Sequence, residues 1–125
     1  MKCCLLISKH VVLTNRQCQQ LITILDDLIV RCYVQSFWLG YSYDCHPVCC
    51  AIVMELQKKY PHIEVQIPST IQSNKIRSKK NPTYSIIDDC WYCIFYYNQQ
   101  QKGSKLAFEY AQKKKKVVMN LAKKD

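Results

Sequence analysis

The chain of 125 residues is 49% hydrophobic and 22% charged, and it contains only 2 glycines and 4 prolines. These proportions exclude a fibrous, low-complexity or disordered protein, and the length fits a single globular domain over residues 1–125. The formal net charge of +9 at pH 7 permits an anionic partner, such as a nucleotide or a nucleic acid.

The chain begins with a strand, a helix and a strand. Residues 3–7 (CCLLI) form a continuous apolar run, which predicts a strand buried on both faces. Thr14 and Gln17 make a capping-box pattern, and apolar residues then recur at helical spacing over residues 15–33. Residues 35–39 (QSFWL) predict the second strand.

A second helix and a third strand follow. Pro47 suits the first position of a helix, where its missing N–H leaves no hydrogen bond unmade, and Pro61 ends that helix. The apolar face that we expect for it consists of Val48, Ile52, Val53 and Leu56. Residues 63–67 alternate as a strand, and the polar residues 68–80 predict a mobile loop.

The last third of the chain predicts a helix, a strand, a loop, a helix and a strand. The first helix covers residues 82–89, and the strand is the β-rich run CIFYY at 93–97. The polar loop after it ends in Gly103-Ser104. The helix KLAFEYAQKKKK then occupies residues 105–116, and VVMNL at 117–121 is expected to be a second buried strand.

Strands that alternate with helices predict an α/β fold with a mainly parallel five-stranded sheet and helices on both faces. Right-handed crossovers favour a doubly wound, Rossmann-like arrangement. Such sheets bind ligands beyond the carboxyl ends of their strands. The segments expected at that edge are Ser8–His10, Gly40–Asp44 and Asn98–Ser104.

The nine cysteines are an odd number, and most of them sit in apolar runs. We interpret them as small buried hydrophobes of a cytoplasmic protein and not as a disulfide framework. Cys45, His46, Cys49 and Cys50, together with the C-x-x-C of Cys90 and Cys93, have spacings found in zinc sites. Because Cys49 and Cys93 fall at expected core positions, we predict no metal.

The sequence also bears on localisation and on partners. No apolar run approaches the roughly 20 residues that cross a bilayer, and the N-terminal residues make a poor signal peptide. We therefore expect a cytoplasmic protein with no membrane partner, and we leave a homo-oligomer open. Residues 1–70 carry six basic and five acidic side chains, whereas residues 71–125 carry twelve and four. The simplest interpretation of Lys113–Lys116 is a solvated helix end, where cations complement the dipole.

Five segments resemble the YpsA-like branch of the SLOG superfamily. They are MKCCLLISKH, FWLGYSYDC, VMELQKKYPHI, IIDDCWYCIFYYN and KGSKLAFEYAQKKKKVVMNL. This superfamily of Rossmann-like proteins includes the DNA-processing DprA proteins and the LOG phosphoribohydrolases. The resemblance implies a single Rossmann-like domain that binds a nucleotide or a nucleotide-derived ligand. It implies no established reaction, because this branch has none.

The chain departs from the family pattern at several site positions. The family's T-G-H-R after the first strand aligns with Ile7–His10, so the glycine and the arginine are lost. Of the Gly-rich turn after the second strand Gly40 remains, and His46 stands where the family has an Asp. Gly103-Ser104 is the element that matches well. The resemblance therefore implies a partly degenerate site, with a changed ligand or with none.

The residues expected to bind the ligand are polar groups and glycines at the carboxyl edge. Gly103 would let a phosphate approach the backbone, and Ser104 would cap the helix or bond a phosphate oxygen, although a plain loop and cap fit equally. Lys9 would pair with a phosphate, and Tyr41 or Tyr43 would stack on a base, although exposed loop residues and ordinary surface tyrosines fit at least as well. The full set is Ser8, Lys9, His10, Gly40, Tyr41, Asp44, Asn98, Gly103 and Ser104.

Two other functions stay open. A nucleic-acid-binding protein, by analogy with DprA, would use the basic second half of the chain, with Lys75, Arg77, Lys79 and Lys80 as the first contacts. A nucleotide-processing hydrolase would need a catalytic set, and we find no complete one, since Glu109 lies in the middle of a helix. A binding protein without a cofactor, other than a nucleotide-derived ligand, is the leading hypothesis.

Overall fold

The computed structural model describes residues 1–7, 11–39, 46–66, 82–97 and 102–122, and for residues 82, 83 and 102–104 it describes the backbone alone. Strands and helices alternate through these ranges, as predicted. The elements are β1 (Lys2–Leu6), α1 (Asn15–Arg31), β2 (Ser36–Leu39), α2 (Pro47–Lys59), β3 (Glu64–Gln66), α3 (Pro82–Asp89), β4 (Tyr92–Phe95), α4 (Lys102–Lys113) and β5 (Val117–Asn120).

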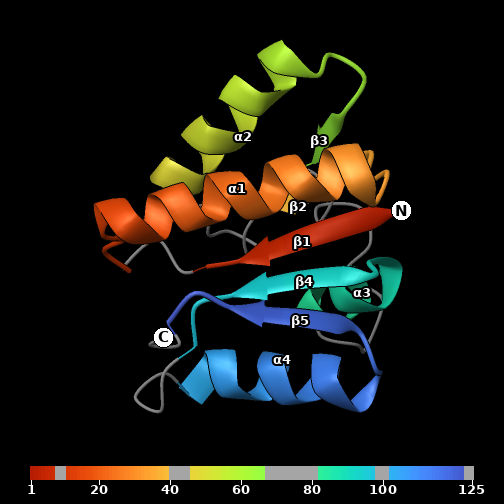
Figure 1. Ribbon diagram of the computed structural model, residues 1–125. Coiled ribbons are helices and arrows are strands. Elements are labelled where there is room, and N and C mark those ends of the chain that lie inside the picture. Colours follow the sequence, from red (N-terminus) through yellow and green to blue (C-terminus); the bar gives the residue numbers. More distant parts are fainter. Residues whose placement is uncertain (8–10, 40–45, 67–81, 98–101, 123–125) are drawn as a thin grey trace.

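The five strands form one parallel sheet in the order β3-β2-β1-β4-β5. The chain starts in the centre at β1, builds outward through β2 and β3, and then returns to the other side of β1 to add β4 and β5. All the strands point the same way, and α1 and α4 begin near the arrowhead ends (Figure 1). The predicted doubly wound, Rossmann-like α/β fold is therefore confirmed.

Two hydrophobic cores lie on the two faces of the sheet. The first lies under α1 and α2 and receives Cys3 and Leu5 from β1 and Ile7 from just beyond it. The second lies under α3 and α4 and receives Cys4 and Leu6. Because β1 is central and covered on both faces, both sets of alternating side chains are buried, which explains its continuous apolar sequence.

The first helix follows its sequence signals closely. Thr14 Oγ1 accepts a hydrogen bond from the Gln17 N–H (3.1 Å), and Gln17 Oε1 accepts one from the Thr14 N–H (2.9 Å), which confirms the capping box. Its buried face is Leu21, Leu25, Leu28 and Ile29. The helix ends before Tyr33, which has a left-handed φ of 58°.

The predicted apolar face of α2 was wrong at one position. Val48 is 38% exposed, and the buried residues are Cys49, Val53 and Leu56. These three stand at i, i+4 and i+7, so they form one stripe toward the sheet, and Val48 lies beside it. Val48 and Cys49 are both apolar in sequence, and the position of the sheet decides which of the two is buried.

The prediction that residues 117–121 form a buried strand was also wrong. β5 is an edge strand with β4 as its neighbour, and Val117 is 40% exposed. The strand before it ends at Phe95, so Tyr96 and Tyr97 follow β4 and do not belong to it. A continuous apolar run is typical of a covered strand, but the strand order decides which strands lie at the edge.

The last helix begins and ends earlier than its pattern indicates, since it covers Lys102–Lys113 and not residues 105–116. α4 starts at Lys102, so Gly103 and Ser104 lie in its first turn and do not precede it. At the other end the Lys116 N–H donates to Ala111 O (3.1 Å) and the Lys115 N–H to Gln112 O (3.0 Å). With Lys115 at a φ of 59°, these two bonds make a Schellman motif with lysine where glycine is usual.

Within the described ranges, no helix combines the length and the apolar character that crossing a membrane requires.

Candidate functional site

The strand order reverses between β1 and β4, and this point defines the expected ligand edge. From β1 the chain continues through α1 on one face of the sheet, and from β4 it continues through α4 on the other. Both helices therefore begin at the carboxyl edge beside the reversal (Figure 1). In open α/β sheets this crevice is where ligands bind.

The helix starts at this edge have no negative charge of their own. In none of the described helices does the first turn carry an acidic residue. In α1 the capping box already satisfies the Gln17 N–H. In α4 the first turn consists of Lys102, Gly103 and Ser104, whose backbone N–H groups have no partner within the helix. An anion at either start would be favoured by the helix dipole.

Asn120 fixes the chain where it leaves β4. Its Oδ1 accepts hydrogen bonds from the N–H groups of Tyr97 (2.9 Å) and Ala122 (3.0 Å), and its Nδ2 donates to Tyr97 O (2.9 Å). The Gln17 side chain of α1 donates to Leu121 O at 3.2 Å. Sequence analysis missed the role of Asn120, because nothing in VVMNL indicates that its amide would bond to the segment that follows β4.

Aromatic rings from the middle of α4 and from the end of β4 pack together. Phe108 of α4 packs edge-to-face on Phe95 with ring centroids 5.4 Å apart, and it stacks on Tyr97 at 4.9 Å. Tyr97 is half-buried. Tyr97, the second residue after β4, is thus held by Asn120 through its backbone and by Phe108 through its ring.

Most of the predicted ligand contacts lie outside the described residues. These are Ser8, Lys9, His10, Gly40, Tyr41, Asp44 and Asn98, and for the alternative nucleic-acid contacts Lys75, Arg77, Lys79 and Lys80. Gly103 and Ser104 are described in their backbone, in the first turn of α4. Residues 8–10 directly follow Ile7, which is buried next to the end of β1, and 98–101 directly precede α4.

His46 has a structural role that the sequence did not indicate. It is the N-cap of α2, where its Nδ1 accepts a hydrogen bond from the Val48 N–H at 3.1 Å. Its Nε2 lies 2.6 Å from Val11 O. Because Nδ1 accepts, Nε2 is the ring nitrogen that donates to Val11 O. Both ring nitrogens are occupied, and the buried ring joins α2 to the segment that follows β1.

The cysteines are mostly core residues, with one correction. Seven are free thiols, whereas Cys50 is disulfide-bonded, so the expectation that all nine act as buried hydrophobes was wrong. Burial, with a smaller contribution from Cys18, raises the pKa of the Cys49 thiol to about 12. Hydrogen bonds with Cys90 and Cys93 raise the pKa of Cys4 well above its usual value. Among the described residues, no cluster of His, Cys, Asp or Glu side chains is arranged to hold a metal ion.

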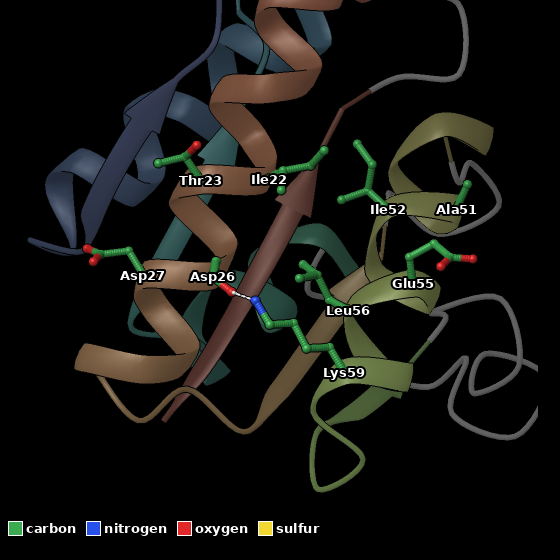
Figure 2. Close-up of a pocket in the computed structure, with 9 residues that line it drawn as sticks. All are labelled: Ile22, Thr23, Asp26, Asp27, Ala51, Ile52, Glu55, Leu56 and Lys59. Carbon is green, nitrogen blue, oxygen red and sulfur yellow. Dashed lines mark hydrogen bonds and ion pairs between the residues drawn. The ribbon is translucent and has the colours of Figure 1, made fainter.

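A groove of about 640 Å³ lies elsewhere, between α1 and α2. Figure 2 shows Lys59 reaching from α2 toward Asp26 of α1, 3.3 Å away. The hydrogen bond from the Tyr60 hydroxyl, with help from Lys59, lowers the pKa of Asp26. The lining residues are Ile22, Thr23, Asp26, Asp27, Ala51, Ile52, Glu55, Leu56 and Lys59.

The acids of this groove all have basic partners. Besides the Asp26–Lys59 pair, Asp27 pairs with Arg31 (3.0 Å) and Glu55 with Lys58 (3.1 Å). The groove lies between α1 and α2, on one face of the sheet, and not at the reversal of strand order. Its shape does not make it the ligand site, because the fold and the helix dipoles favour the carboxyl edge.

Comparison with known proteins gave no relative: no family model, no curated protein and no solved structure matches the chain.

Proposed function

We propose that this protein binds a nucleotide or a nucleotide-derived anion at the carboxyl edge of the sheet, between β1 and β4. The observation that carries the proposal is the reversal of strand order at that point, with α1 and α4 beginning there on opposite faces of the sheet. A ligand in this crevice would meet two helix N-termini at once.

Charge supports an anionic ligand. Each helix start contributes partial positive charge, and no first-turn carboxylate competes for it. Gly103 has no side chain to keep a phosphate away from the backbone N–H groups of α4. Lys9 and His10 follow β1 in the sequence and would supply a cation and a hydrogen-bonding ring at the same crevice.

The resemblance to the YpsA-like SLOG proteins supports the same ligand class. It proposes a site of Ser8, Lys9, His10, Gly40, Tyr41, Asp44, Asn98, Gly103 and Ser104, with the changed positions altering which nucleotide derivative is bound. The proposed role is binding and not catalysis, because the sequence offers no complete set of catalytic residues.

A thermal-shift screen tests the proposal. Mononucleotides, dinucleotides and sugar nucleotides would be added to the full chain at increasing concentrations. A ligand at about 100 times its Kd adds roughly 2.7 kcal/mol of stability, which for a domain of this size raises the Tm by on the order of 10 °C. If no member of the panel raises the Tm, the proposal is wrong.

One variant locates the site. Ser104→Glu puts a carboxylate in the first turn of α4, which favours the helix dipole but repels an anion bound there. Thr23→Glu, exposed in the middle of α1, adds the same charge away from the edge. We expect Ser104→Glu to abolish the ligand-induced shift and Thr23→Glu to preserve it. A shift that survives in both variants would put the ligand elsewhere.

A further inference from the structure

The end of α4 carries four consecutive lysines, Lys113–Lys116, and the first three of them are exposed. The helix dipole explains one or two cations at this position. It does not explain why a lysine stands at position 115. Lys115 adopts the left-handed conformation, which costs a non-glycine residue roughly 1 kcal/mol. Helix termination alone would be served better by glycine.

These lysines differ from the paired basic residues elsewhere in the described part of the chain. Lys2 pairs with Asp89, Arg31 with Asp27, and Lys58 and Lys59 with carboxylates of α2 and α1. None of the four ammonium groups of Lys113–Lys116 forms a salt bridge with a described carboxylate. Lys116 donates instead to the backbone oxygen of Asp88 (3.3 Å), and Lys114 lies over the Tyr110 ring at 5.5 Å.

An exposed indole lies beside the lysines. Trp91 is 49% exposed, and the Lys116 ammonium lies over its ring, 5.9 Å from the centroid. The Val117 N–H donates to Trp91 O at 3.0 Å, which holds the segment before β4 beside the start of β5. Since Tyr92 pairs with Val117 and Cys3 with Tyr92, the residues before them, Lys2, Trp91 and Lys116, form a row across β1, β4 and β5.

This surface lies at the opposite end of the sheet from the proposed nucleotide site. The row lies at the amino ends of the strands, and α4 ends beside it, whereas the nucleotide would lie at the carboxyl ends (Figure 1). The two sites would therefore be occupied independently. Together, the four lysines and the indole form a lysine–tryptophan surface, which consists of Lys113, Lys114, Lys115, Lys116 and Trp91.

We propose that the lysine–tryptophan surface binds single-stranded nucleic acid. Unpaired lysines neutralise successive phosphates, and an exposed aromatic ring stacks on an unpaired base of any sequence. An anionic membrane fits less well, because binding in the plane of a bilayer needs an apolar helix face. In α4, Ala107 and Ala111 are buried against the sheet and Phe108 packs on Phe95, so Leu106, which is 60% exposed, does not make an apolar helix face by itself.

The binding assay uses the full chain and a fluorescein-labelled thymidine oligonucleotide of about 15 nucleotides. If three lysines contact phosphates, the logarithm of the affinity falls with the logarithm of salt concentration with a slope of about −2. Stacking on Trp91 should quench the intrinsic tryptophan fluorescence. Trp91→Leu should remove the quenching and lower the affinity about fivefold or more, while the affinity for a duplex changes little.

A pair of matched double variants separates this surface from net charge. Lys113→Gln/Lys115→Gln should weaken binding at least about tenfold in about 50 mM salt and make the salt slope shallower. Lys58→Gln/Lys59→Gln removes the same charge from exposed positions at the end of α2 and should leave the affinity unchanged. Lys115→Gly should bind more weakly although it relieves the left-handed strain, so lost folding cannot account for the loss.

Several results would overturn the proposal. One is an equal loss in both double variants, which would indicate attraction by net charge alone. Another is binding that depends on Lys79→Gln/Lys80→Gln and not on the surface. The third is tighter binding to phosphatidylserine vesicles, or equal binding to polyphosphate with no effect of Trp91→Leu. The predicted order of the variants, together with the quenching of Trp91, would support it.

Discussion

The two faces of the sheet are covered by helices of different construction. α1 and α2 cover one face with large aliphatic side chains, among them Leu21, Leu25 and Val53. α4 covers the other with Ala107 and Ala111, so its backbone lies close to the sheet and Phe95 fills the space. The first face is packed by side-chain volume, and the second by close approach of the helix.

The same two regions differ in how their charges are used. On the α1/α2 side the acids of the groove are each paired with a base, so the surface is close to neutral. At the end of α4 the lysines have no such pairs. The excess charge of residues 71–125 is therefore partly gathered on one surface. Net charge by itself says little about partners, and the distribution of paired and unpaired charges says more.

The largest expected effect separates the two modes of packing. Leu25→Ala in α1 should lower the free energy of unfolding by about 2–5 kcal/mol, because it leaves a cavity where a side chain is fully buried. Ala111→Leu in α4 should cost about 1–3 kcal/mol by overpacking. Urea unfolding measures both, and Ala51→Leu on the exposed side of α2 should stay within roughly 0.5 kcal/mol. If Ala111→Leu leaves the free energy of unfolding unchanged, α4 does not pack closely against the sheet at this position.

The next effect concerns His46, which ties α2 to the segment after β1. His46→Ala should destabilise the protein by about 1–3 kcal/mol, since both the cap of α2 and the partner of Val11 O are lost. His46→Asn should recover the cap but not the bond to Val11, and its stability should lie between those of His46→Ala and the parent protein. Equal stability of His46→Ala and the parent protein in urea would show that neither bond matters.

A smaller effect compares the ends of α1 and α4. Tyr33 and Lys115 both adopt a left-handed φ, which glycine tolerates without strain. Tyr33→Gly and Lys115→Gly should each raise the free energy of unfolding by about 0.5–1 kcal/mol, after the greater flexibility of glycine in the unfolded chain is counted. If Lys115→Gly destabilises instead, its side chain contributes to the fold, and the case for a binding role weakens.

The smallest effect is the dependence of stability on pH. Hydrogen bonds from Lys2 (2.8 Å) and from the Trp38 indole (3.3 Å) lower the pKa of Asp89 below its ordinary value. A lowered folded-state pKa stabilises the protein when the carboxylate is ionised, so this stability is present at neutral pH and is lost as the pH falls through the acidic range. The side chain is 45% exposed, so the effect is modest.

Asp89→Asn should reduce this loss of stability at acidic pH, which urea midpoints measured from neutral to acidic pH would detect. Asp26→Asn is the counterpart on the α1/α2 side, since the Tyr60 hydroxyl and Lys59 lower the pKa of Asp26 as well. If neither substitution changes the loss of stability at acidic pH, other carboxylates control it.

Local signals were sufficient for the elements and insufficient for their surroundings. The capping box of Thr14 and Gln17 and the helix at Pro82–Asp89 were predicted correctly, because a cap or a proline acts within a few residues. Val48 and Val117 were assigned to the core wrongly, because burial depends on which other element lies opposite. Gly103-Ser104 was identified, but the start of α4 was predicted at residue 105, after its actual start at Lys102.

The sequence alone determined the order and type of the elements, and hence a parallel α/β sheet, because hydrophobic periodicity and turn chemistry are local properties. Tertiary structure alone decided the strand order, and with it the ligand edge, the exposed side of β5 and the row of Lys2, Trp91 and Lys116. It also decided that His46 is a cap and that Lys113–Lys116 form no salt bridge with a described carboxylate. Such pairings join residues far apart in the chain, and no local pattern specifies them.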